Sequence, residues 1–189
     1  MSLLLIAASP SAPSRSASLL AAAGERLKHL GLTTRSLNLR ELPAEALLQA
    51  QGEAAGLREA VQQVREARVV VLATPIYKAA YSGLLKVFLD LLPQDGFKGK
   101  LVWPLATAGS PAHLLALDYA LRPVIAALGA QDVVSPVFAA DTQLPRCQAG
   151  GDYLLTDEIL RRLSDGAAQV FERLSSPAQL ALADQRCSA

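Results

Sequence analysis

Long apolar runs are scarce in this sequence, and their scarcity argues against a membrane or an exported protein. The apolar run near the start, Leu3–Ala8, is only six residues long, has no basic segment before it and leads into a Ser/Pro-rich stretch. A membrane-spanning helix needs about 20 apolar residues, and a signal peptide begins with a basic region. We therefore expect neither a signal peptide nor a membrane span, and we expect a cytoplasmic protein.

The sequence also lacks an excess of charge and has little cysteine. Its 18 basic and 17 acidic residues leave a formal net charge of +1, which provides no field to attract nucleic acid or an anionic membrane surface. The two cysteines, Cys147 and Cys187, are far apart and do not form a C-x-x-C pair. We therefore expect no nucleic-acid partner, no membrane contact and no metal site.

Two familiar nucleotide-binding motifs, G-x-G-x-x-G and G-x-x-x-x-G-K-[ST], are absent as well. Their absence disfavours a Rossmann-type pyrophosphate turn and leaves a single terminal phosphate as the better candidate ligand. A different loop follows the first apolar run: it is rich in serine and proline, and a helical apolar pattern begins after it at Leu19 and Leu20. This order predicts a strand, a loop and a helix.

The loop before this predicted helix has the chemistry of a phosphate site. It carries Ser9, Ser14, Ser16 and neighbouring serines together with Arg15. The first N–H groups of a helix lack intrahelical partners and lie at the positive end of its dipole, so they suit an anion. Hydroxyls add neutral donors, and the guanidinium adds a charged fork. An ordinary Ser/Pro turn that caps a helix explains the same residues, and the loop alone does not decide between the two.

Apolar periodicity alternates between strand and helix along the chain. The expected strands are Leu3–Ala8, Thr33–Leu39, Val69–Ala73, Lys100–Thr107 and Val133–Phe138. The expected helices are Ser14–Leu30, Gly56–Arg68, Leu84–Leu92, Pro111–Leu128 and Tyr153–Leu174. The unbroken β-branched run at Val69–Ala73 is typical of a central strand, and Pro104 indicates an irregular or weakly paired position.

The connections between the expected strands are too long for hairpins, so they predict parallel strands joined by right-handed crossovers. We therefore predict an α/β fold: a flavodoxin-like, doubly wound, five-stranded parallel sheet of order 2-1-3-4-5 with helices on both faces. The chain is expected to form a single domain over 1–176, followed by a flexible tail over 177–189.

In that topology three loops meet at the carboxyl ends of the strands: Ser9–Ser18, Thr74–Gly83 and Thr107–His113. The first loop would bind a phosphate, the second loop offers an apolar and aromatic surface, and the third loop offers hydroxyls and backbone N–H groups. A ligand with one phosphate, a planar face and a polar rim matches this set, which makes FMN the leading candidate. Hydride transfer from a reduced nicotinamide to a flavin needs no acid, base or nucleophile from the protein, so we expect no catalytic side chain.

Four segments of the sequence carry a resemblance to a known family. They are SPSAPSRSASLL, ATPIYKAAYSGLLKVFLDLLP, GKLVWPLATAGSPAHLLALDYALRPV and ALGAQ, and the likeness covers about residues 1–143. They closely resemble the NADPH-dependent FMN reductases that serve two-component alkanesulfonate or methanesulfonate monooxygenases. The T-P-x-Y-x-x-x-Y-S-G stretch is the most specific part of the likeness.

The resemblance implies a set of flavin-binding residues. In that family the serine-rich loop binds the FMN phosphate, the P-x-Y segment lies against the isoalloxazine, and the T-G-G loop contacts its pyrimidine edge. Carried over by position, these residues are Ser9, Ser14, Arg15 and Ser16; Pro75, Ile76, Tyr77 and Lys78; and Thr107, Gly109 and Ser110. Ala108 replaces the first glycine of the T-G-G pattern, and it would be strained if that position requires positive φ.

The resemblance also implies partners and an assembly. It implies NADPH as the hydride donor, with NADH as an open alternative, and a reduced FMN that leaves for a monooxygenase in a transient contact. It further implies a homodimer or homotetramer, with a π-bulge at Tyr119 in a subunit interface. Pro123 favours a local bulge because it has no N–H for the carbonyl of Tyr119, although an ordinary proline kink explains the sequence equally well.

Two other functions stay open on the sequence alone. A quinone, azo-dye or chromate reductase would retain FMN as a prosthetic group and admit another acceptor. A flavodoxin-type electron carrier would bind FMN without hydride chemistry, although such carriers are typically strongly acidic and this chain is nearly neutral.

Overall fold

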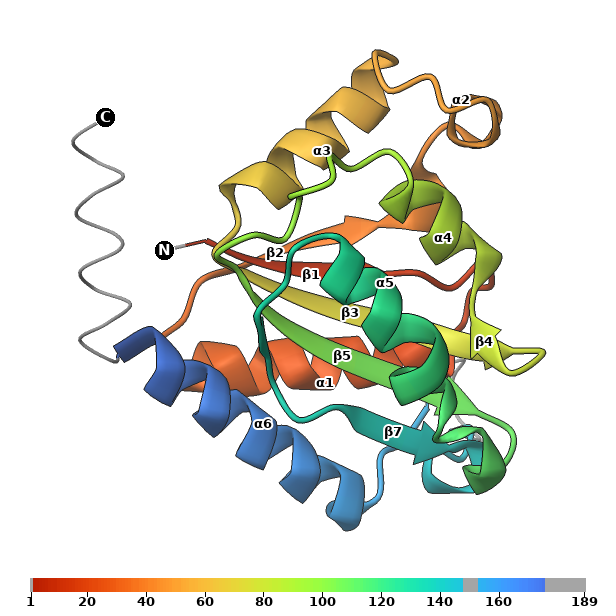
Figure 1. Cartoon of the computed structure of the whole chain (residues 1–189). Helices are drawn as coiled ribbons and strands as arrows, with labels where there is room; N and C mark the ends of the chain where they lie inside the picture. The colour runs from red at the N-terminus through yellow and green to blue at the C-terminus, as the bar shows by residue number, and fades with distance from the viewer. Residues whose placement is uncertain (1, 148–152, 176–189) are drawn as a thin grey trace.

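A computed structural model of the chain describes residues 2–147 and 153–175. At its centre is a mostly parallel sheet of order β2-β1-β3-β5-β6, in which β7 pairs further along β5 and the short β4 pairs antiparallel to β3 (Figure 1). The strands are β1 (Leu3–Ala7), β2 (Thr34–Asn38), β3 (Val69–Tyr77), β4 (Ala80–Tyr81), β5 (Leu101–Ala108), β6 (Asp132–Val133) and β7 (Val137–Ala140). The predicted order 2-1-3-4-5 is confirmed, with β5 as the fourth strand and β6 and β7 together as the fifth.

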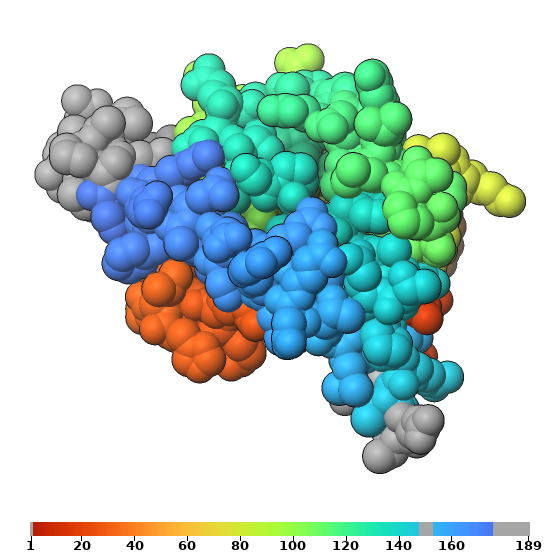
Figure 2. Space-filling view, turned by 90° about the horizontal axis from the view of Figure 1, so that it is seen from below, coloured from red at the N-terminus to blue at the C-terminus, as the bar shows by residue number. Residues whose placement is uncertain are grey.

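Helices cover both faces of this sheet. One face carries α1 (Arg15–His29) and α6 (Asp157–Ser175), which pack side by side as Figure 2 shows. The other face carries α2 (Ala44–Leu48), α3 (Ala55–Glu66), α4 (Gly83–Leu89) and α5 (Arg122–Ala127) (Figure 1). An apolar cluster fills the space between sheet and helices on each side. The predicted doubly wound, flavodoxin-like α/β architecture is confirmed.

The three central strands are buried on both faces, which explains their nearly continuous apolar sequence. β3 is the middle strand, as predicted from its β-branched run, and its residues from Val69 to Ile76 are all buried. It is longer than the expected Val69–Ala73, because Thr74–Tyr77 continue the strand and pair with β5 and then with β4. The extension carries the chain out past the carboxyl end of β1.

The expected fifth strand, Val133–Phe138, is split in two. β6 pairs with the start of β5, and the last hydrogen bond of this pairing runs from the N–H of Val134 to the carbonyl of Val102 at 2.8 Å. The next donor on that side of β5 would be Pro104, which has no N–H. Pairing therefore stops there and resumes with β7 from Leu105 onward. The irregular position predicted at Pro104 is confirmed.

The expected long helix Pro111–Leu128 is wrong as a single α-helix. A 3-10 turn, η2 (Pro111–His113), is followed by a π-helical turn, η3 (Leu117–Leu121), and then by α5. The N–H of Arg122 bonds the carbonyl of Leu117, five residues back. Pro123 has no N–H for the carbonyl of Tyr119, so the α-helical pattern cannot continue through this point. The bulge, one of two alternatives at the sequence level, is what the structure shows.

The last helix begins later than expected. The prediction was Tyr153–Leu174, whereas α6 runs from Asp157 to Ser175 and Tyr153 instead pairs with Arg146 in an isolated antiparallel bridge. Five of the six residues expected to face inward are buried as predicted, whereas Leu155 lies before α6 and is only half-buried. The five buried residues are Ile159, Leu163, Ala167, Val170 and Leu174. The expected tail over 177–189, and Cys187 with it, lies outside the described residues. Within the described part of the chain, no helix is long and apolar enough to cross a membrane.

Candidate functional site

The loop between β1 and α1 is built around serine hydroxyls. Ser14 is the N-cap of α1, and its hydroxyl accepts a bond from the N–H of Ala17 at 3.5 Å. The same hydroxyl lies 3.0 Å from that of Ser16, which is almost completely buried. The hydroxyl of Ser9, also buried, accepts from the N–H of Ser11 at 3.2 Å. The loop thus gathers several donors at the positive end of a 15-residue helix.

The second loop is a tight hairpin that presents an aromatic ring. Tyr77 ends β3 with 48% of its surface exposed, although the residues before it are buried. Lys78 and Ala79 form the turn with φ values of 49° and 63°, and Ala80 and Tyr81 return as β4. Burial raises the pKa of the Tyr81 phenol above its ordinary value, so this phenol is neutral at physiological pH.

A buried polar network ties the first two loops together. The hydroxyl of Ser82 donates to the carbonyl of Ala8 at 2.6 Å and accepts from the N–H of Leu85 at 3.1 Å, which caps α4. The N–H of Ser82 donates to the hydroxyl of Thr74 at 3.0 Å. Thr74 and Ser82 thereby fix the hairpin relative to the end of β1. No local sequence signal marks this role, because the contact between Ser82 and Ala8 joins residues 74 positions apart.

The third loop leaves β5 without the backbone strain considered above. Ala108 is the last residue of β5, is buried and lies in extended conformation, and positive φ values occur elsewhere. Alanine is therefore tolerated where the family pattern has glycine. Gly109 follows it, and Ser110 caps η2 by accepting from the N–H of Ala112 at 3.2 Å.

These three loops surround one cavity of about 250 Å³ at the carboxyl ends of β1, β3 and β5. Eight of the predicted site residues line it: Ser9, Ser14, Arg15, Pro75, Ile76, Tyr77, Thr107 and Gly109. The other three do not. Ser16 is buried behind Ser14, Lys78 lies at the exposed tip of the hairpin, and the hydroxyl of Ser110 is used to cap η2. The lining also includes Ala108, which the sequence analysis considered only for its backbone, and four residues that were not predicted as site residues: Ser11, Pro13, Asp141 and Tyr153.

A fourth segment, between β7 and α6, holds Arg15. The Nη1 atom of Arg15 lies 3.1 Å from the Oδ2 atom of Asp141, and its Nε donates to the carbonyl of Leu144 at 3.1 Å. The guanidinium carbon also lies 4.6 Å from the ring centroid of Tyr153, in cation–π contact. No local sequence signal marks these contacts, because they join residues more than 120 positions apart. Only the folded chain brings them together.

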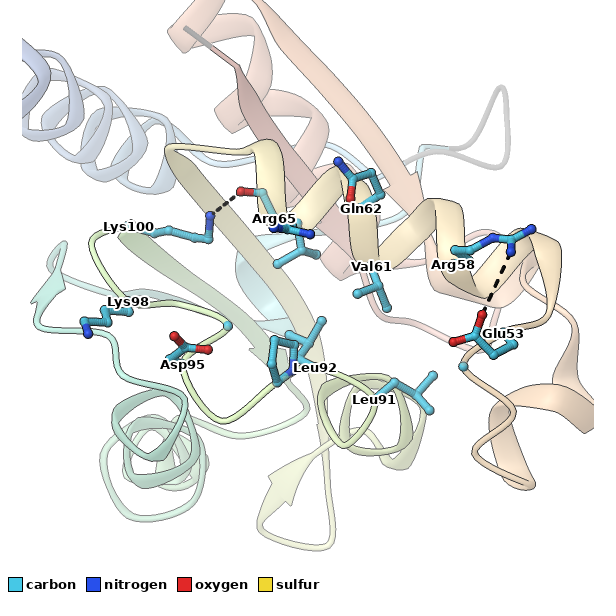
Figure 3. A pocket seen from close by; sticks show the side chains of 14 residues that line it. Glu53, Arg58, Val61, Gln62, Arg65, Leu91, Leu92, Asp95, Lys98 and Lys100 are labelled. Atoms are coloured by element: carbon cyan, nitrogen blue, oxygen red, sulfur yellow. Dashed lines mark hydrogen bonds and ion pairs between the residues drawn. The ribbon is translucent and has the colours of Figure 1, made fainter. Parts of the chain in front are cut away.

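A larger cavity, of about 760 Å³, lies elsewhere, along α3 and the connection from α4 to β5 (Figure 3). Its apolar lining includes Val61 and Leu92. Lys100 also lines it, and its Nζ donates to the carbonyl of Arg65 at 2.8 Å. Ligands of doubly wound sheets bind beyond the carboxyl ends of the strands, at the point where the strand order reverses. Lys100 precedes β5 and so marks the opposite edge of the sheet. We therefore place the candidate site in the smaller cavity.

Comparison with known proteins agrees with this geometry. A family model described as NADPH-dependent FMN reductase matches residues 1–144, which include all three of the predicted loops. The chain belongs to the NADPH-dependent FMN reductase family. The match includes Asp141 and Leu144 but ends before Tyr153, the third contact of Arg15.

Individual members of the NADPH-dependent FMN reductase family are similar over most of the chain. An FMN reductase (NADPH) of Escherichia coli (strain K12) is 48% identical over 144 residues, covering 76% of this chain and 75% of that protein. An FMN reductase (NADPH) of Pseudomonas putida is 39% identical over 165 residues, covering 87% and 84%. The apo structure of an NADH:FMN oxidoreductase, EMOB, superposes with a TM-score of 0.80 at 37% identity, covering 94% of this chain and 92% of that one.

The residues of the cavity fit the flavin that gives the NADPH-dependent FMN reductase family its name. Hydroxyls and a guanidinium line the cavity beside the N-terminus of α1, which suits a phosphate. The exposed ring of Tyr77 offers a planar surface, and Thr107 and Gly109 add polar groups to the lining. Among residues 2–147 and 153–175, no group of three or more His, Cys, Asp or Glu side chains is placed to hold a metal ion.

Proposed function

We propose that this protein binds FMN in the cavity at the carboxyl ends of β1, β3 and β5 and reduces it with NADPH. The observation that supports this most directly is the convergence of Ser9, Ser14, Arg15 and Tyr77 on one cavity from two loops far apart in sequence. The family match and the similar FMN reductases make FMN the ligand to test first.

The protein's residues bind and orient rather than exchange protons. Ser9, Ser14 and Arg15 hold the phosphate, with the first N–H groups of α1. Pro75, Ile76 and Tyr77 support the ring system, and Thr107 with Gly109 and their backbone N–H groups contact its polar edge. FMN, when bound, supplies the acceptor for the hydride of the reduced nicotinamide. N–H donors at the polar edge stabilise negative charge there, which favours reduction.

The reduced flavin then leaves for a partner monooxygenase that uses it. This places FMN as an exchangeable substrate instead of a permanent prosthetic group. Steady-state kinetics test this: saturation by free FMN with NADPH oxidation supports exchange. Double displacement with retained FMN and a quinone or azo acceptor would support the alternative reductase.

The test of the binding site is a titration of FMN, riboflavin and FAD, followed by oxidation of NADPH and NADH. We expect FMN to bind more tightly than riboflavin, because only FMN carries the terminal phosphate. Arg15→Ala should weaken FMN binding about 10- to 100-fold, because it removes a charge-assisted contact, and should leave riboflavin binding unchanged. Equal loss for both ligands would contradict the phosphate assignment.

A further inference from the structure

Arg15, the proposed phosphate ligand, already has three partners in the structure. They are the carboxylate of Asp141, the carbonyl of Leu144 and the ring of Tyr153. All three come from the stretch between β7 and α6. An arginine held from several sides keeps its guanidinium in one place, and this lowers the entropy cost of binding an anion.

Only one of the three partners carries a negative charge. The carbonyl of Leu144 and the face of Tyr153 orient the guanidinium without neutralising it. Asp141 adds a full counter-charge 3.1 Å from Nη1. The feature that only Asp141 adds to this arrangement is therefore its charge.

The same carboxylate faces the ligand cavity. Asp141 lines the cavity together with Ser9, Ser14 and Arg15. Its side chain is 39% exposed and that of Arg15 is 32% exposed, so water screens the pair only in part. A phosphate dianion beside Arg15 therefore gains from the guanidinium and is repelled by the neighbouring carboxylate.

We propose that Asp141 sets the affinity for the FMN phosphate by opposing it, which keeps the flavin exchangeable. This inference rests on the proposed function, because it requires FMN in this cavity. It explains how one site combines a pre-oriented arginine, typical of tight phosphate binding, with release of the flavin after reduction. Asp141 acts on the bound anion through its charge and takes no part in hydride transfer.

The test compares Asp141→Asn with the unchanged protein. Asparagine keeps an oxygen acceptor for Nη1 of Arg15 and removes the charge. We expect the dissociation constant for FMN, measured by flavin fluorescence at low salt, to fall about tenfold, and FMN release to slow in stopped-flow measurements. Riboflavin affinity should not change, because riboflavin has no phosphate. The difference between the two proteins should shrink as salt is raised.

A matched control is Asp90→Asn, which removes a carboxylate paired with Lys86 at 2.6 Å at the end of α4. It changes the net charge equally and lies outside the cavity lining, so FMN affinity should stay the same. Asp141→Ser, which also removes the charge, should repeat the result of Asp141→Asn if the fold tolerates both, as circular dichroism would show.

The outcomes separate this inference from the proposed function. Tighter FMN binding in Asp141→Asn, with riboflavin and Asp90→Asn unchanged, supports it. Unchanged or weaker FMN binding in the variant overturns it, and weaker binding would make Asp141 a positioning residue for Arg15. If the unchanged protein binds FMN no better than riboflavin, the cavity does not bind the phosphate. That result would contradict the proposed function as well as this inference.

Discussion

Two consecutive residues other than glycine, Lys78 and Ala79, hold positive φ in the turn that presents Tyr77. A two-residue hairpin turn of this kind normally uses Asn-Gly or Asp-Gly, because the left-handed region is costly for residues with a Cβ atom. The turn thus maintains strain beside the candidate site, where a fixed aromatic ring is useful. Relief of this strain should stabilise the fold.

Ala79→Gly should raise the free energy of unfolding by about 0.5–1 kcal/mol, because relief of the left-handed strain outweighs the extra chain entropy of glycine. The matched control is Ala80→Gly, one residue later in β4, where the backbone is not left-handed. Ala80→Gly should lower the free energy of unfolding by a similar amount. Urea unfolding of the two variants measures both free energies. A change of the same sign in both variants would contradict the assignment of strain to Ala79.

Among the helices, α6 depends on a close approach to the sheet at Gly166. A Cβ atom at this position would clash with Cζ2 of Trp103, a fully buried ring of β5. At Gly24 in α1 the nearest atom, Cδ1 of Leu5, is 2.7 Å away but belongs to the end of a flexible side chain. The two glycines therefore differ in how much their surroundings can adjust.

Gly166→Ala should lower the free energy of unfolding by about 1–3 kcal/mol, because a rigid ring must move and the gain in helix propensity does not compensate. Gly24→Ala should stay within about 1 kcal/mol of the unchanged protein. Trp103 is the only tryptophan of the chain, so its fluorescence follows the change directly in a denaturant titration. Equal losses in the two variants would show that the contact with Trp103 is not decisive.

The elements that sequence predicts well are those whose signal is local and repeated. The β-branched run in β3, the serine N-cap of α1 and the inward face of α6 all follow from spacing that each segment carries by itself. The break at Pro104 and the bulge before Pro123 also follow from a missing N–H, although only the structure decides between bulge and kink.

The parts of the site that sequence missed depend on long-range contacts. Asp141 follows β7 and Tyr153 precedes α6, so both reach Arg15 through contacts that no spacing in the sequence encodes. The same holds for Ser82 and Ala8, joined across the ends of two strands. Ser16, Lys78 and Ser110 fit the family pattern by position but do not line the cavity. Ser16 is buried, Lys78 is exposed in the hairpin turn, and the hydroxyl of Ser110 caps η2.

At the level of the assembled protein, the helical segment around η3 exposes apolar side chains. Tyr119 is 80% exposed, Leu115 58% and Leu114 46%, all within six residues on the face that carries α5. The π-helical turn adds a residue to this segment and so widens the surface that it presents. We propose that this surface joins two copies of the chain, because exposed aromatic and aliphatic side chains that lie together are typical of interfaces.

Tyr119→Ala should weaken self-association at least tenfold, because a large aromatic side chain buried in an interface contributes much of its binding energy. Light scattering over a range of protein concentrations measures the mass of each species.

Phe171→Ala removes another exposed aromatic side chain, 40% exposed on α6 on the opposite face of the sheet, and should leave the measured mass unchanged. Riboflavin affinity should also stay unchanged in Tyr119→Ala, because Tyr119 does not line the flavin cavity. A chain that is monomeric at all concentrations before any substitution would rule out this interface, whereas loss of association in both variants would point to a general effect of surface aromatics.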